Sequence, residues 1–228
     1  MTLPKLSFVI DKEADKDIGR QLVKKTRDGM TIEEFVDKWY AEKINEIEKS
    51  RKETEETWGL VNEKVLKRLS EIMQIEWPSR KIWVIMSINQ SVQPRSLRWW
   101  VFFVSYAYNV EMRKGVVLHE ITHFLFFEKW KQVFPDYDER EFERPHLPWE
   151  LSEMTAEIID QDGELIKLVP EALKNIYHGR YHTIRLANGE DLISHFSRIY
   201  EEHQSNFGEM LKIAYSEIKA LKPLLLSS

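Results

Sequence analysis

The 228-residue sequence contains no cysteine. That absence excludes disulfide-stapled scaffolds, thiol nucleophiles and every metal site with a thiolate ligand, zinc fingers included. Any chemistry that the chain performs must therefore come from oxygen and nitrogen groups. Internal repeats, low-complexity segments and a recognisable linker are lacking as well, so we expect a single domain over residues 1–228.

Long apolar runs and blocks of basic residues are also missing. No run is long enough to cross a bilayer, and the first residues lack the basic-then-apolar build of a signal peptide. Lysine and arginine total 33 against 38 acidic residues, giving a formal net charge of −5. We therefore expect a soluble, cytoplasmic protein without nucleic-acid or membrane partners. The oligomeric state is not predicted.

The segments that are present indicate a mostly helical chain. Apolar residues at three- and four-residue steps predict N-terminal helices over 31–75, and C-terminal helices over 170–228. A capping box formed by Thr31 and Glu34 is predicted to begin the first of these helices.

The central region, 81–161, changes character. Two short runs rich in β-branched and aromatic residues, 81–88 and 97–106, predict two strands. Because a polar loop joins them, we expect the strands to form a small antiparallel sheet. Two further helical segments complete this region, so the predicted fold class is α+β, mostly helical with a small sheet.

The most informative segment is His119-Glu120-Ile121-Thr122-His123. On a helix, positions i and i+4 lie on one face, so both imidazoles can reach one ion at about 2.0–2.1 Å. On a strand the same residues would be roughly 13 Å apart. Glu120 is placed to take a proton from a metal-activated water. The alternative is a pair of structural histidines that bind no metal. Burying such polar groups without partners costs free energy.

This HExxH segment resembles the zincin metallopeptidases. The metzincin extension is absent, because Phe126 and Lys129 stand where that branch has glycine and histidine. Downstream, Glu153-Met154-Thr155-Ala156-Glu157 is similar to the gluzincin pattern ExxA followed by Asp or Asn. The resemblance covers 81–161 and is shared with compact minigluzincins, ImmA/IrrE-type peptidases and soluble Ste24-like peptidase domains. It implies a zincin-like fold, in which the sheet packs over the active-site helix.

The resemblance also implies a ligand set for Zn²⁺, in which Glu153 joins His119 and His123. Glu157 would hold the far N–H of a ligating imidazole, although its side chain is longer than the usual Asp or Asn. Three other acidic residues stay open as the third ligand: Glu143, Glu150 and Glu157.

A peptidase also needs donors for the oxyanion that forms on the scissile carbonyl. Residues 177–182 concentrate such donors, and we take His178 and Tyr181 as the candidates. A polar turn around Gly179 explains the same residues equally well. The resemblance further implies that substrate pairs with a sheet edge, for which 99–106 is the natural candidate.

The predicted function is a zinc metallopeptidase, a hydrolase acting on a peptide or protein substrate. Glu120 would act first as general base and then as general acid. The alternative is a zinc-binding regulatory or interaction protein of the same fold without peptidase activity. A third possibility is a purely structural helical protein without metal. The sequence predicts neither the substrate nor the cleavage preference.

Overall fold

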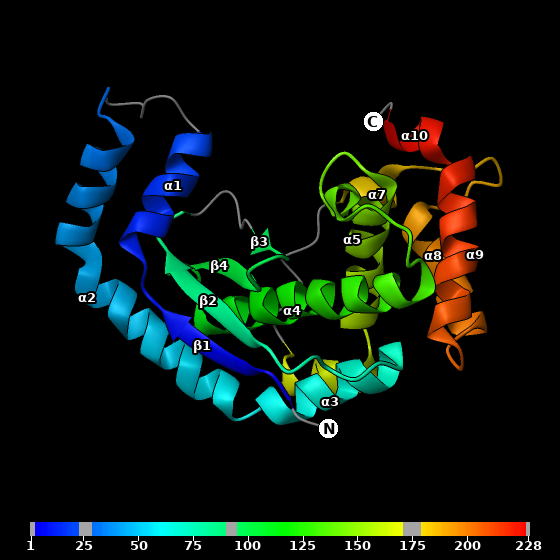
Figure 1. Ribbon diagram of the computed structural model, residues 1–228, viewed down its shortest axis with the longest axis horizontal. Helices are drawn as coiled ribbons and strands as arrows, with labels where there is room; N and C mark the ends of the chain where they lie inside the picture. Colours follow the sequence, from blue (N-terminus) through cyan, green and yellow to red (C-terminus); the bar gives the residue numbers. More distant parts are fainter. Residues whose placement is uncertain (1–2, 23–28, 90–94, 171–178, 227–228) are drawn as a thin grey trace.

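The computed structural model describes residues 3–22, 29–89, 95–170 and 179–226. These residues form a mostly helical structure with a small sheet, which confirms the α+β class (Figure 1). The strands are β1 (Lys5–Val9), β2 (Lys81–Ser87), β3 (Arg95–Ser96) and β4 (Val101–Ser105). The helices in the first half are α1 (Lys12–Leu22), α2 (Ile32–Gly59), α3 (Asn62–Met73) and α4 (Val110–Val133). Those that follow are η1 (Glu139–Phe142), α5 (Leu147–Asp160), α6 (Gly163–Leu168), α7 (Arg180–Thr183), α8 (Leu192–Glu202), α9 (Phe207–Ala220) and α10 (Lys222–Leu226).

The sheet has the strand order β1-β2-β4-β3, and its three longer strands are parallel. The predicted antiparallel sheet is therefore wrong, since only the two-residue β3 runs antiparallel to β4. The antiparallel expectation followed from the polar loop between the two predicted strands, 81–88 and 97–106, and the N-terminal strand β1 is a further element that the sequence pattern does not predict. In the structure, residues 88–100 connect β2 to β4. That connection is long enough to return the chain to the start of the next strand, as a parallel pair requires.

The predicted substrate edge, 99–106, is also partly wrong. Leu97–Trp100 form a turn, and β4 begins only at Val101. Val101 and Phe102 already pair with β3 on the side of β4 away from β2. The first half of β4 therefore has a strand on both sides and is not a free edge.

The helix that carries the HExxH segment, α4, is held by contacts on several sides. It packs on β4, α2, α3, α5 and α9, so that in Figure 1 it connects the sheet to the C-terminal helices. Asn109 caps its first turn by accepting from Met112 N at 2.8 Å. Arg113, which is buried, donates to Thr54 Oγ1 of α2 at 2.7 Å and to the Tyr106 carbonyl at 3.3 Å. These bonds fix the start of α4 against both α2 and the end of β4.

The two faces of the sheet differ in what covers them. Ile82, Val84 and Met86 of β2 belong to the main core, together with the apolar residues of α4. On the opposite face, Ile85 and Phe103 pack with Ile18 of α1 in a small second cluster. The alternation of faces along β2 thus buries one side under α4 and only part of the other under α1.

The helices at the two ends match their predictions in part. The capping box of Thr31 and Glu34 at the start of α2 is confirmed, with both hydrogen bonds present. Within the predicted helical region 170–228, the described residues form α7, α8, α9 and α10, and Asn206 caps α9. The start predicted at residue 170 falls beside 171–178, which lie outside the described residues. Among the described residues, no helix has both the length and the apolar character needed to span a membrane.

Candidate metal centre

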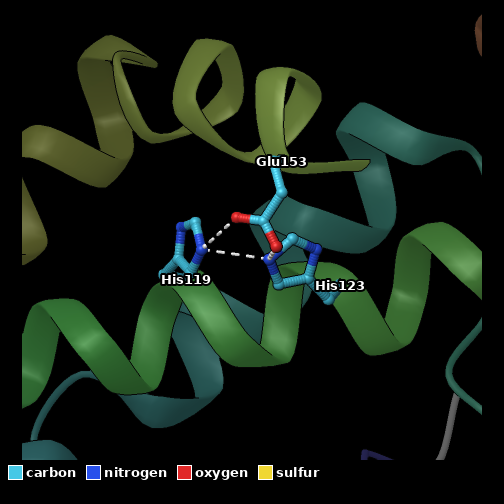
Figure 2. A group of neighbouring side chains, drawn as sticks. All are labelled: His119, His123 and Glu153. Atoms are coloured by element: carbon cyan, nitrogen blue, oxygen red, sulfur yellow. Dashed lines mark hydrogen bonds and ion pairs between the residues drawn. The ribbon is translucent and has the colours of Figure 1, made fainter. Parts of the chain in front are cut away.

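The site lies where α4 and α5 pack against each other. The helix α5 begins with a proline in its first turn, a position that loses no hydrogen bond to the missing N–H. Ala156 is fully buried, and its small side chain suits a close approach of α5 to α4. As a result, Glu153 of α5 projects onto the face of α4 that carries the two histidines (Figure 2).

His119, His123 and Glu153 form one compact group. The two Nε2 atoms lie 3.0 Å apart, and the Glu153 carboxylate lies 3.3 Å from His119 Nε2 and 3.4 Å from His123 Nε2 (Figure 2). Two ligands of a tetrahedral zinc ion with bonds near 2.05 Å are separated by about 3.3 Å. The spacing of these three groups therefore matches that of zinc ligands, and the group could hold a metal ion.

The chemistry of the donor set fits the same ion. Two imidazoles and one carboxylate are nitrogen and oxygen ligands that zinc accepts, with three protein ligands leaving a position open. The His123 side chain is fully buried, while 12% of the His119 side chain and 14% of the Glu153 side chain remain exposed. The site is thus rigidly packed on one side and reachable on the other.

The electrostatic surroundings favour a positive charge at this point. Burial alone would lower the pKa of His119, but the carboxylates of Asp160 and Glu153 outweigh it and raise that pKa to about 10. The two carboxylates thus favour a positive charge at His119, and a metal ion bound there would have to displace the proton from the ligating nitrogen.

One functional residue was missed by the sequence reasoning. Asp160 lies on α5 with a fully buried side chain, and its Oδ2 is 3.5 Å from His119 Nδ1. A carboxylate on the far nitrogen of a ligating histidine sets its tautomer and ring orientation. The sequence contains a signal for Asp160, because Glu153, Glu157 and Asp160 follow the i, i+4, i+7 spacing of one helix face.

The structure places Asp160 within 3.5 Å of the far nitrogen of His119, whereas the Glu157 carboxylate has another neighbour. The Glu157 carboxylate contacts His182 Nε2 of α7, and both residues line a surface cavity of about 560 Å³ beside α5 and α8. Burial raises the pKa of Glu157, and His182 opposes that rise. Glu157 therefore has a partner other than a ligating imidazole.

The other acidic alternatives do not join the group. Glu143 is exposed at the end of η1. Glu150 is buried on α5, where it accepts from Tyr181 Oη at 2.7 Å and from Arg180 Nη1 at 3.2 Å. Neither residue belongs to the group of possible ligands around His119.

The two candidates for oxyanion stabilisation have different outcomes. His178 lies outside the described residues. Tyr181 is buried on α7, and burial together with the Glu150 carboxylate raises its pKa well above the ordinary value. Its hydroxyl therefore stays protonated at neutral pH, as a hydrogen-bond donor must. Glu120 is also buried, at 4% exposed, on the same helix as the two histidines.

Asp160→Asn is expected to lower zinc affinity by about 10- to 100-fold, because a neutral amide holds His119 less firmly. A competition titration with a chromogenic chelator measures this change. Glu157→Gln, the same kind of change on the same helix, is the matched control and should leave the affinity unchanged. Equal losses in both variants would contradict the separate roles of Asp160 and Glu157.

Comparison with known proteins gives no match for this chain. No protein-family model, no curated protein and no solved structure shows significant similarity to it.

Proposed function

We propose that this protein is a zinc-dependent metallopeptidase of the gluzincin type. The proposal is carried by one observation, the mutual spacing of 3.0–3.4 Å between the side-chain atoms of His119, His123 and Glu153 across the α4–α5 contact. The HExxH segment and the downstream ExxA segment support it, because they place two imidazoles and a carboxylate on facing helices. Its substrate would be a peptide or protein.

The proposed division of labour follows from the positions of the side chains. A bound zinc ion would supply Lewis acidity toward a water molecule and the scissile carbonyl. Glu120, next to His119 in sequence, would accept a proton and later deliver it to the leaving amine. Glu120 is 4% exposed, on the helix that carries the two histidines. Asp160 would hold His119 in the tautomer that presents Nε2 to the metal.

Tyr181 is our proposed oxyanion donor. Without substrate its single hydroxyl proton is donated to Glu150, which lies one helical turn before Glu153 on α5, and we propose that substrate binding redirects this proton to the oxyanion. Arg180 strengthens the same link, because it contacts Glu150 and also donates to the Leu225 carbonyl of α10 at 2.6 Å. This arrangement would keep α7 against the ligand helix during turnover.

The test is a combined metal and activity measurement on the purified chain. Elemental analysis is expected to find about one zinc per chain. Digestion of a peptide library, read by mass spectrometry, should show cleavage that stops with a chelator and returns when zinc is added back. Zinc without any cleavage would favour the regulatory zinc-binding alternative, and no zinc would leave the purely structural interpretation.

A further inference from the structure

Charge is unevenly distributed along this chain. Residues 77–110 contain four basic residues and no acidic one, although the whole chain carries a formal charge of −5. This segment includes β2, β3 and β4. The sheet therefore forms a locally positive region on an acidic molecule.

The positive side chains gather with two exposed tryptophans where β2 and β4 begin. Trp83 is 39% exposed and Trp99 67% exposed. Lys81 Nζ lies 3.5 Å from the centre of the Trp83 ring, and Arg98 lies 4.9 Å from that of Trp99. The parallel register places Lys5 of β1 beside Lys81. We call this surface the cationic patch, and its members are Lys5, Arg80, Lys81, Trp83, Arg98 and Trp99.

The charges of the cationic patch are not neutralised locally. Within the described residues, no carboxylate lies within ion-pair distance of its four cations. On α1, by contrast, Lys12 and Lys16 both pair with Asp37 of α2. The cations of the patch thus remain available to an anionic partner.

One residue, Trp100, links the cationic patch to the helix that carries the two histidines, although Lys81 and Trp83 lie on the face of the sheet away from α4. Trp100, which is 3% exposed, stacks on Phe124 at 5.1 Å, and Phe124 follows the ligand His123 directly. The backbone of Trp100 is left-handed, with φ at 52°, a conformation that bulky residues rarely adopt. That turn directs Trp100 into the core while its neighbour Trp99 stays at the surface.

We propose that the cationic patch binds an acidic segment of the peptide substrate, on one side of the scissile bond. This inference rests on the proposed peptidase function and names its substrate class. Carboxylates of the segment would pair with the four cations, and its backbone and apolar atoms would cover the two indoles. A polyanion that extends well beyond the cationic patch, such as a nucleic acid, is less suited, because the acidic remainder of the molecule would repel the part outside the patch, whereas a short acidic segment of a peptide can end within it.

The binding test uses a fluorescein-labelled (Glu-Ala)6 peptide and fluorescence anisotropy, with the full zinc-loaded chain carrying Glu120→Gln to prevent cleavage. Adding Lys81→Glu and Arg98→Glu is expected to weaken binding by at least about tenfold. A second variant, Lys5→Glu with Arg80→Glu, should also weaken binding of the acidic peptide. Binding of the neutral analogue (Gln-Ala)6 should be weaker and should not change in either variant.

The matched control reverses two exposed lysines away from the patch, Lys49 of α2 and Lys64 of α3, which gives the same change in net charge. If Lys49→Glu with Lys64→Glu weakens binding equally, overall charge explains the effect and the proposal is overturned. Tighter, patch-dependent binding of a single-stranded DNA 12-mer or of phosphatidylglycerol vesicles would also overturn it, in favour of a polyanion or a membrane surface.

Cleavage kinetics separate this inference from the function on which it rests. For acidic peptides in a library, Lys81→Glu with Arg98→Glu should lower kcat/KM about tenfold, chiefly through KM. If the protein cleaves peptides without any preference for acidic ones, the proposed role of the cationic patch is wrong and the proposed peptidase function stands. Patch-dependent peptide binding without cleavage by the wild-type chain would overturn the peptidase and leave the patch as a docking surface.

Discussion

Glu120→Gln is expected to retain about one zinc per chain while kcat falls by about 10²- to 10⁴-fold. The reason is that an amide of the same shape cannot accept the proton that peptide hydrolysis releases. Glu120 is not one of the three possible metal ligands, so the zinc content should not depend on its charge. Zinc is measured by elemental analysis, and kcat by cleavage of the best library peptide.

Glu128→Gln is the matched control for this substitution. Glu128 lies two turns later on α4 and pairs with Lys131 at the surface, so both zinc content and kcat should stay at wild-type values. Loss of zinc in Glu120→Gln would instead mean that Glu120 supports the site structurally. Unchanged biological function despite lost turnover would favour the regulatory alternative over the enzyme.

Glu153→Ala is expected to reduce the zinc content from about one per chain to nearly none. Without this carboxylate only two imidazoles remain, whereas catalytic zinc sites use three protein ligands. The loss should appear in elemental analysis after gel filtration. Turnover should disappear with the metal, in contrast to Glu120→Gln, which separates metal binding from proton transfer.

Glu143→Ala provides the comparison, since Glu143 is exposed at the end of η1 and outside the ligand group. Its zinc content and turnover should equal those of the wild type. If Glu143→Ala lost its zinc while Glu153→Ala kept it, the assignment of Glu153 as the third ligand would be wrong. Retention of zinc by both variants would point to a third ligand elsewhere.

The two variants together test an arrangement that depends on the packing of α5. Glu150, Glu153, Glu157 and Asp160 all lie on this helix, yet each has a different partner. Glu150 binds Tyr181, Glu153 faces the two histidines, Glu157 contacts His182, and Asp160 approaches His119. Four acidic side chains in one segment thus have four different environments, and only the neighbouring helices distinguish them.

The sequence by itself determined the features that follow from local spacing. Residues four apart on a helix share a face whatever surrounds them, so His119 and His123 could be paired without a structure. The capping box before α2 is equally local, since its two residues satisfy each other's backbone donors. The choice of Glu153 came from a resemblance, and the structure brings that residue to the two histidines.

Only the tertiary structure decided what depends on residues far apart in the chain. The parallel sheet is one such feature, because β2 pairs with β4 beyond a 13-residue connection and with β1 across the whole of α1, α2 and α3. The approach of Asp160 to His119 is another, because it depends on how α5 packs against α4. Local spacing specifies which residues share a helix face. The packing of helices and strands specifies which residues of other elements contact that face.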